Sequence, residues 1–98
     1  MQKGGCIYIM TNTFRTTVYI GVTSNLEGRI WEHKNKVYPK SFTAKYNLNR
    51  CVYYECFFTI QEAISREKEL KAWRRSKKNE LINQLNPYWE DLYNQLIN

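Results

Sequence analysis

Two stretches decide the fold of this chain: CIYIM at Cys6–Met10 and VYIGV at Val18–Val22. Both are rich in β-branched and aromatic residues, and the polar residues 11–16 separate them, so an antiparallel hairpin is expected. Side chains alternate between the two faces of a strand. If the aliphatic residues of both strands point into one core, Tyr8 and Tyr19 lie together on the opposite face.

Two interpretations of the tyrosine pair are open at this point. An aromatic cross-strand pair that only stabilises the sheet would explain Tyr8 and Tyr19. Gly21, which shares a face with Tyr19, leaves space that a functional site would need. The strands alone favour the structural pair, so the functional interpretation depends on the helices.

Two capping boxes mark where helices begin. The capping box at Ser24–Glu27 predicts a helix start at Asn25, and the one at Thr59–Glu62 predicts a helix over residues 60–74. In each, a hydroxyl side chain accepts from a backbone N–H of the first turn, so both helix starts are well defined.

Composition predicts the remaining segments. RCVYYECFF at Arg50–Phe58 is rich in β-formers and predicts a third strand, whereas the polar residues 36–49 predict a long loop. Residues 76–85 predict another helix, and Asn86–Pro87 predicts the start of a short C-terminal helix because proline is favoured at the first helical position. The order ββαβααα predicts one small α/β (α+β) domain over residues 1–98, with helices flanking a sheet.

Charge and hydropathy limit the class of function. Fifteen Lys and Arg against nine Asp and Glu give a formal net charge of +6, which favours an acidic partner such as nucleic acid. Hydrophobic residues make up 43% of the chain, which excludes a disordered tail. No apolar run approaches the roughly 20 residues that span a bilayer, and no signal peptide is evident, so a cytoplasmic protein without membrane contact is expected.

The cysteines argue against a structural zinc site. Cys6, Cys51 and Cys56 follow no CxxC pattern, and His33 is the single histidine of the chain. A set of four zinc ligands is therefore hard to assemble. Reduced, packed thiols are expected instead.

The first predicted helix carries two residues that suit a site. At about 100° per residue, Leu26 and Ile30 define its buried stripe, with His33 next to the stripe and Arg29 on its shoulder. Arg29 and His33 are four residues apart, so one lies above the other. A solvated arginine and a hydrogen-bonded histidine at the rim would be the structural explanation.

The helix predicted over residues 60–74 carries an acidic residue where charge is costly. Glu67 projects onto the middle of its apolar stripe, which consists of Ile60, Ala63, Ile64 and Leu70. A carboxylate on a buried face must be paired, hydrogen-bonded or bound to a cation. Either Glu67 forms an ion pair with an arginine, or it is a ligand for a hard divalent cation.

Together, Tyr8, Tyr19, Arg29, His33 and Glu67 have the chemistry for phosphodiester hydrolysis. One carboxylate can hold one Mg²⁺ or Mn²⁺ that keeps most of its waters, and such an ion polarises a phosphate oxygen. The arginine would stabilise charge on the phosphate, and a tyrosine would activate water.

The ordered motifs resemble the GIY-YIG endonuclease superfamily. Ile7-Tyr8 resembles the end of the GIY element, with Cys6 in place of its glycine, and Tyr19-Ile20-Gly21 is the YIG element. TSNLEGRIWEHK resembles the segment with the catalytic arginine, which falls on Arg29, with His33 four residues on.

The second half of the chain continues the resemblance. EAISREKELKAWRR resembles the segment with the metal-binding glutamate, which falls on Glu67. NPYWEDLY resembles the ending of a short stand-alone bacterial branch, which is itself similar to the N-terminal nuclease domain of the excinuclease C subunit. Val22 stands where some members have a lysine, no second histidine is present, and Asn86 is the candidate for a supporting asparagine.

The resemblance implies a three-stranded antiparallel sheet flanked by helices and one-metal cleavage of DNA. It also implies that Tyr8, Tyr19, Arg29, His33 and Glu67 share one site, with a single Mg²⁺ or Mn²⁺ at Glu67. A non-catalytic nucleic-acid-binding module of the same fold is the first alternative. A nuclease subunit that a partner protein directs to its target is the second.

A basic segment adds a second clue to DNA. Between residues 66 and 78, seven basic residues stand against two acidic ones. This composition favours contacts with the phosphate backbone, although a solvated helix face would explain any single lysine. The predicted binding residues are Lys68, Lys71, Arg74, Arg75, Lys77 and Lys78.

Overall fold

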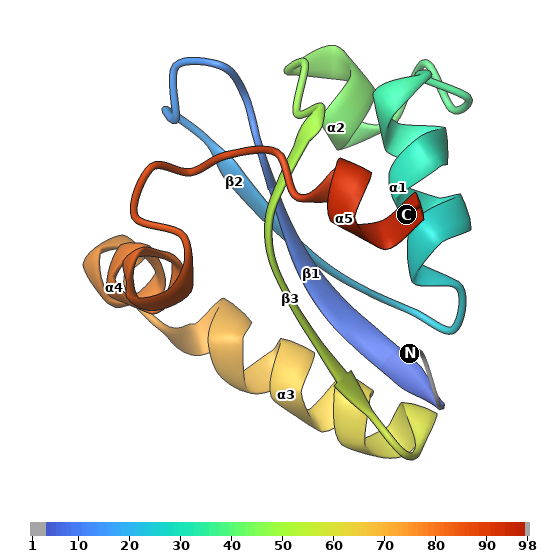
Figure 1. The fold of residues 1–98 in the computed structure, drawn as a ribbon, viewed down its shortest axis with the longest axis vertical. Coiled ribbons are helices and arrows are strands. Elements are labelled where there is room, and N and C mark those ends of the chain that lie inside the picture. The colour runs from blue at the N-terminus through green and yellow to red at the C-terminus, as the bar shows by residue number, and fades with distance from the viewer. Residues whose placement is uncertain (1–3, 98) are drawn as a thin grey trace.

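A three-stranded antiparallel sheet forms the centre of the computed structural model, which describes residues 4–97 (Figure 1). The strand β1 (Gly5–Thr11) lies between β2 (Val18–Thr23) and β3 (Arg50–Phe57). The chain therefore has the predicted fold, a small α+β arrangement with helices around an antiparallel sheet. None of the helices within residues 4–97 has the length and apolar character needed to span a bilayer.

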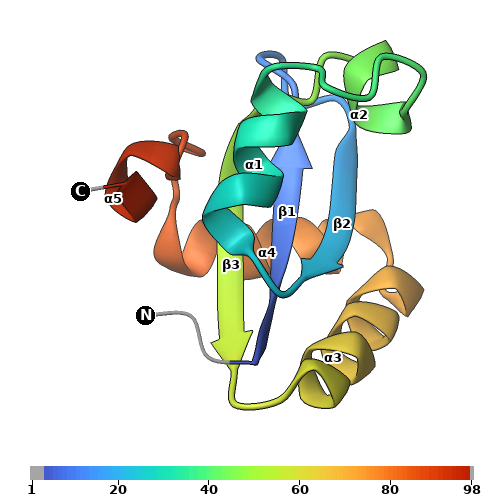
Figure 2. The same ribbon diagram turned by 90° about the vertical axis from the view of Figure 1, so that its right-hand side faces the viewer.

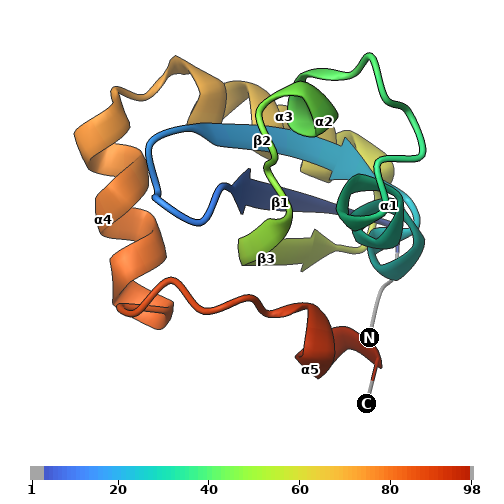
Figure 3. The same ribbon diagram turned by 90° about the horizontal axis from the view of Figure 1, so that it is seen from above.

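Helices cover both sides of the sheet. In Figure 1, α1 (Leu26–Lys34) lies on one side and α3 (Ile60–Ala72) on the other. The helix α4 (Arg75–Leu85) follows α3, and the short α5 (Tyr93–Ile97) lies next to α1. Figure 3 shows the C-terminal segment running along the β3 side of the sheet, with α3 on the β2 side.

Strand alternation separates two hydrophobic cores. Ile7 and Ile9 of β1 point toward α3 and α4, where Leu70 and Ile82 complete the larger core. The neighbouring residues of β1 point toward α1, where the second core consists of Cys6, Tyr8, Met10, Leu26, Ile30, Leu48 and Cys51. Tyr19 packs against the second core, so both tyrosines lie on one face, as the alternation predicts.

A bulge changes the register of β3. Ile9 pairs with Tyr53 and Met10 pairs with Cys51, so Val52 is an extra residue opposite β1. Val52 and Tyr53 consequently both belong to the larger core, although they are consecutive. The bulged edge also receives the C-terminal segment, because the Asn86 amide donates to the Val52 carbonyl at 3.0 Å.

Two predictions, for the start of α1 and for the segment after it, need correction. Asn25, not Ser24, caps α1, because its side chain accepts from the Gly28 N–H at 3.2 Å. The predicted loop over residues 36–49 contains the short helix α2 (Phe42–Lys45), which Ser41 caps. In contrast, the capping box of Thr59 and Glu62 at the start of α3 is confirmed with both of its hydrogen bonds.

The C-terminal helix begins later than predicted. Asn86 is the C-cap of α4, and the Trp89 N–H donates to the Asn86 carbonyl at 2.9 Å, which closes a turn. Trp89 adopts a φ of 54°, and this left-handed backbone cannot continue a right-handed helix. Helix α5 therefore starts only at Tyr93.

The expectation of reduced cysteines is wrong for two of the three. Cys6 and Cys56 are register partners on β1 and β3, and they form a disulfide. Cys51 is a buried free cysteine, and burial raises the pKa of its thiol to about 12. The pairing depends on strand register, which cysteine spacing does not reveal.

Candidate active site

A buried hydrogen-bonded chain links the sheet to α1 and α2. The Tyr8 hydroxyl lies 2.8 Å from Nε2 of His33, and Nδ1 of His33 lies 2.7 Å from the Thr43 hydroxyl. All three side chains are buried. A neutral imidazole has one donor and one acceptor nitrogen. The hydrogen bonds from Tyr8 through His33 to Thr43 therefore all run in the same direction.

Burial sets the protonation of this chain. Burial, followed by the positive charge of Arg29, lowers the pKa of His33 to about 4. Burial, followed by the proximity of Tyr19, raises the pKa of Tyr8 to about 12. Near pH 7, the imidazole and the phenol are therefore both neutral, and one ring nitrogen of His33 is a hydrogen-bond acceptor.

Tyr19 and Gly21 define the other side of the Tyr8 ring. The ring centroids of Tyr8 and Tyr19 are 6.4 Å apart, and those of Tyr19 and His33 are 5.8 Å apart. A Cβ atom at Gly21 would lie 2.3 Å from the Tyr8 hydroxyl oxygen, closer than any real contact. Glycine is therefore required here for Tyr8 to keep its position.

Arg29 of α1 lies next to the Tyr8 phenol. Burial alone would lower the pKa of Arg29, but hydrogen bonds with Glu32 and Tyr8 outweigh it and raise the pKa. Its guanidinium donates to Glu32 at 2.9 Å and stacks 5.6 Å from the centroid of the Tyr38 ring. The charge is thus fixed at the rim of the site, where a phosphate oxygen could reach it.

Glu67 approaches the site from the other side of the sheet. Its carboxylate pairs with Lys71 at 2.8 Å, one turn along α3, and not with an arginine. The Glu67 side chain is 14% exposed, so it is held close to the protein surface but not sealed from solvent. Ile64, predicted in the same apolar stripe, is instead exposed.

A groove crosses the outer edge of β2 and connects the two sides. It has a volume of about 430 Å³ and is lined by Val18, Tyr19, Ile20, Phe42, Lys71 and Lys78. Tyr19 faces the α1 side, whereas Lys71 is the partner of Glu67 on α3. Figure 2 shows β2 as an outer strand with α2 and α3 beside it.

Of the five predicted site residues, four gather on the α1 side of the sheet: Tyr8, Tyr19, Arg29 and His33. Glu67 lies on α3 and is linked to the groove through its partner Lys71. A site shared by all five stays a prediction.

The donor set fits a single weakly held cation. Within the described residues, no three His, Cys, Asp or Glu side chains are grouped as metal ligands. A Mg²⁺ ion commonly uses one or two carboxylates and keeps several waters, and substrate phosphates supply further oxygens. Glu67 fits this role if its carboxylate exchanges Lys71 for the ion.

The predicted backbone-binding residues fall into separate environments. Arg75 donates to the backbone carbonyls of Arg15 and Thr16, so it fastens α4 to the β1–β2 loop. Lys77 lies 4.0 Å from the centroid of the Trp73 ring. Lys71 and Lys78 line the groove next to Tyr19. Lys68 and Arg74 are both exposed, and within residues 4–97 their side chains form no hydrogen bond or ion pair.

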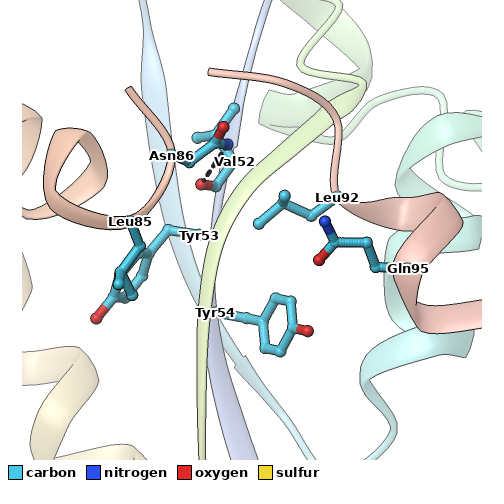
Figure 4. Close-up of a pocket in the computed structure, with 7 residues that line it drawn as sticks. All are labelled: Val52, Tyr53, Tyr54, Leu85, Asn86, Leu92 and Gln95. Carbon is cyan, nitrogen blue, oxygen red and sulfur yellow. Dashed lines mark hydrogen bonds between the residues drawn. The ribbon is translucent and has the colours of Figure 1, made fainter. Parts of the chain in front are cut away.

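Asn86, the candidate supporting asparagine, lies at the opposite edge of the sheet. It lines a pocket of about 280 Å³ with Val52, Tyr53, Tyr54, Leu85, Leu92 and Gln95 (Figure 4). Its amide donates to the carbonyls of Val52 and Glu90. These bonds hold the C-terminal segment on β3, so Asn86 is a structural residue here.

Several site residues were not anticipated from the sequence. Thr43 completes the hydrogen-bonded chain, Phe42 forms a wall of the groove, and Tyr38 stacks with Arg29. All three lie in the segment that was predicted as a loop. The sequence signal that could have pointed to this segment is its charge, because no acidic residue occurs between Glu32 and Glu55.

Comparisons with known proteins agree with the fold. The family model described as the GIY-YIG catalytic domain matches residues 4–80. A UPF0213 protein of Haloquadratum walsbyi is 35% identical over 68 residues, which covers 69% of this chain and 75% of the relative. A UPF0213 protein of Bacillus pumilus is 28% identical over 85 residues, covering 87% and 86%. No solved structure matches the chain.

Proposed function

This chain belongs to the GIY-YIG family, and we propose that it is a metal-dependent endonuclease that hydrolyses DNA phosphodiester bonds. The observation that carries the proposal is the buried chain of Tyr8, His33 and Thr43, with Arg29 at its open end. A tyrosine that only stabilises a sheet needs neither a neutral buried histidine nor an arginine at its hydroxyl.

Tyr8 and His33 are suited to moving a proton away from water. In the arrangement in which the Tyr8 hydroxyl donates to Nε2 of His33, the phenol oxygen accepts from Arg29 and keeps a second lone pair that can accept from water. As water attacks phosphorus, one water proton passes to the Tyr8 oxygen and the Tyr8 proton passes to His33. Thr43 then accepts from Nδ1, which fixes the tautomer that makes this transfer possible.

Arg29 and Glu67 would act on the phosphate. The Arg29 guanidinium would donate to a non-bridging phosphate oxygen and stabilise the charge that grows during attack. Glu67 would hold one Mg²⁺ or Mn²⁺, which when bound polarises a phosphate oxygen and eases departure of the leaving group. Tyr19, next to Tyr8 and the groove, would orient the substrate.

Nicking of supercoiled plasmid with Mg²⁺ or Mn²⁺ tests the proposal. Tyr8→Phe and Glu67→Gln should each lower the nicking rate by about 10²-fold or more, because general acid–base catalysis alone contributes about 10²–10⁴-fold. Tyr88→Phe and Glu69→Gln are matched controls, since Tyr88 is 74% exposed and Glu69 lies on the same helix as Glu67. Equal activity of Tyr8→Phe and Tyr88→Phe would contradict the proposal.

One observation favours the alternative of a non-catalytic nucleic-acid-binding module. Lys71 already neutralises the carboxylate of Glu67. If this pair is permanent, the protein would bind DNA without cleaving it under any metal condition. Mn²⁺ separates the two functions: a catalytic protein should be stabilised by Mn²⁺ as the wild type, whereas in a binding module with a permanent pair Mn²⁺ should stabilise Lys71→Met alone, in which the carboxylate has lost its partner.

A further inference from the structure

The segment between α1 and β3 combines positive charge with exposed aromatic rings. Residues 33–54 contain five basic residues and no acidic one. In the same segment, Tyr38 is 54% exposed, Phe42 is 47% exposed and Tyr46 is 45% exposed. Grouped large apolar side chains at the surface commonly mark a binding site.

Two of these rings, Phe42 and Tyr46, continue a row of aromatic rings that starts at Tyr19 in the candidate active site. The rings of Tyr19 and Phe42 are stacked, with centroids 6.2 Å apart and an interplanar angle of 29°. Phe42 continues to Tyr46 at 4.8 Å, and the Lys45 ammonium lies 5.6 Å from the Tyr46 centroid. Aromatic surface therefore runs without a break from Tyr19 to the outer face of α2.

Phe42 is also a wall of the groove at the edge of β2. Val18 and Ile20 contribute apolar surface, and Lys71 and Lys78 contribute ammonium groups. The volume of about 430 Å³ lies within the range of roughly 300–1,000 Å³ that is usual for ligand sites. An apolar surface, an aromatic wall and two cations are complementary to a nucleobase with its phosphates.

Duplex DNA does not need such a surface. Phosphate contacts position a duplex, and they require cations but no exposed rings. Bases inside a duplex are stacked on each other and cannot lie on Phe42. Proteins that hold single strands instead combine a basic groove with aromatic side chains on which successive bases stack.

We propose that Phe42 and Tyr46, with Lys45, Lys71 and Lys78, form a platform that binds unpaired nucleotides of single-stranded DNA beside the scissile phosphate. The inference deepens the proposed nuclease function, on which it rests, by naming single-stranded DNA as the substrate class. Phe42 and Tyr46 hold bases, the three lysines hold phosphates, and Tyr19 marks where the bound strand enters the active site.

Binding measured without cleavage tests the platform. Fluorescence anisotropy of a labelled oligonucleotide, single-stranded or annealed to its complement, is recorded in the Glu67→Gln background with EDTA. The single strand should bind more tightly than the duplex. Phe42→Leu, which keeps an apolar side chain but removes the ring, should weaken single-strand binding by about 5- to 150-fold, the range expected for one stacked base.

Three further variants control the test. Phe42→Trp should retain single-strand binding, which would show that a ring and not a fold change is responsible. Phe58→Leu removes a ring that is even more exposed, at the β3–α3 junction, and should leave binding unchanged. Lys78→Gln should reduce the slope of log K against log salt by about 0.7 on a single strand.

The outcomes test the platform and the proposed nuclease function separately. Equal binding by Phe42→Leu and Phe58→Leu, or tighter binding of the duplex, would overturn the platform even if the protein nicks plasmid. Loss of single-strand binding in Phe42→Leu, together with a wild-type protein that cleaves nothing, would support the platform and contradict the nuclease.

Discussion

The two faces of the sheet carry different kinds of side chain, aliphatic on one and aromatic and polar on the other. Toward α3 and α4, β1 and β2 present the aliphatic residues Ile7, Ile9 and Ile20 to an apolar core. Toward α1, the same strands present Tyr8 and Tyr19, and His33 of the helix packs near them. One strand thus supplies both faces, and alternation keeps the hydrophobic face apart from the chemical one.

This difference separates the residues that stabilise the fold from the residues of the candidate site. Among the described residues, no buried side-chain nitrogen or oxygen lacks a hydrogen-bond partner. The polar face is therefore fully paired, and its groups are fixed but contribute less hydrophobic stabilisation than aliphatic ones would. The faces meet at the outer edge of β2, where the groove is lined by both Tyr19 and Lys71.

Truncation on the aliphatic face should cause the largest loss of stability. Leu70 is fully buried, and Leu70→Ala should lower the free energy of unfolding by about 2–5 kcal/mol. Urea unfolding measures the loss, with Leu85→Ala as the control, since Leu85 is 75% exposed and should change stability by at most about 0.5 kcal/mol. The folded variant should keep its nicking rate; a lost rate would mean that the two faces are not independent.

Acid should weaken the polar face through its histidine. The pKa of His33 is about 4 in the folded chain, below the usual 6.5, so the unfolded chain binds more protons between these values. The free energy of unfolding should be highest above pH 6.5 and fall by up to about 3 kcal/mol as the pH approaches 4.

His33→Gln provides the comparison for this pH dependence. Its stability should be nearly constant between pH 6.5 and 5, whereas that of the wild type falls. NMR of the single histidine measures its pKa directly. A folded-state pKa near 6.5 would show that His33 is solvated and that the polar face is not sealed.

A methyl group at Gly21 should disturb the polar face alone. Gly21→Ala should cost about 1–3 kcal/mol, as overpacking does, because its Cβ would displace the Tyr8 hydroxyl. Displacing Tyr8 should also raise the pKa of His33 toward 6.5 and abolish nicking. Val22→Ala on the same strand contacts the aliphatic core and should leave that pKa unchanged. The same pKa in both variants would contradict the close packing of Tyr8 against Gly21.

Neutralising Glu67 should have the smallest effect on stability. Its partner Lys71 is 51% exposed, and such a pair along a helix contributes about 0.3–0.5 kcal/mol. Thermal unfolding without metal should therefore place Glu67→Gln within about 0.5 kcal/mol of the wild type, while any stabilisation by Mn²⁺ disappears. A loss of about 3–5 kcal/mol would identify a structural buried pair instead.

The sequence predicted what depends on local periodicity. Strand alternation correctly placed Tyr8 and Tyr19 on one face, and helix periodicity correctly buried Leu26 and Ile30. The Thr59 capping box was found because both of its bonds lie within four residues. The Ser24 box has the same spacing and was nevertheless wrong, because the next residue, Asn25, caps α1 instead.

Features that depend on tertiary contacts were missed. Helix α2 has only four residues, too few for a periodic signal, and its Thr43 is recognisable only through His33. The disulfide follows from the register of β1 against β3. The ion pair of Glu67 and Lys71 was also missed, although it is local: residues four apart on a helix are neighbours, and this spacing is visible in the sequence.

The C-terminal segment that binds the bulged strand β3 affects whether another copy of the protein can pair with that strand. An outer strand offers unpaired backbone groups that can template association with another chain. Here the C-terminal segment occupies those groups: the Leu92 N–H donates to the Cys51 carbonyl at 2.7 Å, and the Asp91 carboxylate accepts from the Cys51 N–H at 3.2 Å. Residues 86–97 lie outside the stretch that the family model matches, and their bonds to Cys51 and Val52 leave fewer backbone groups of β3 open to another chain.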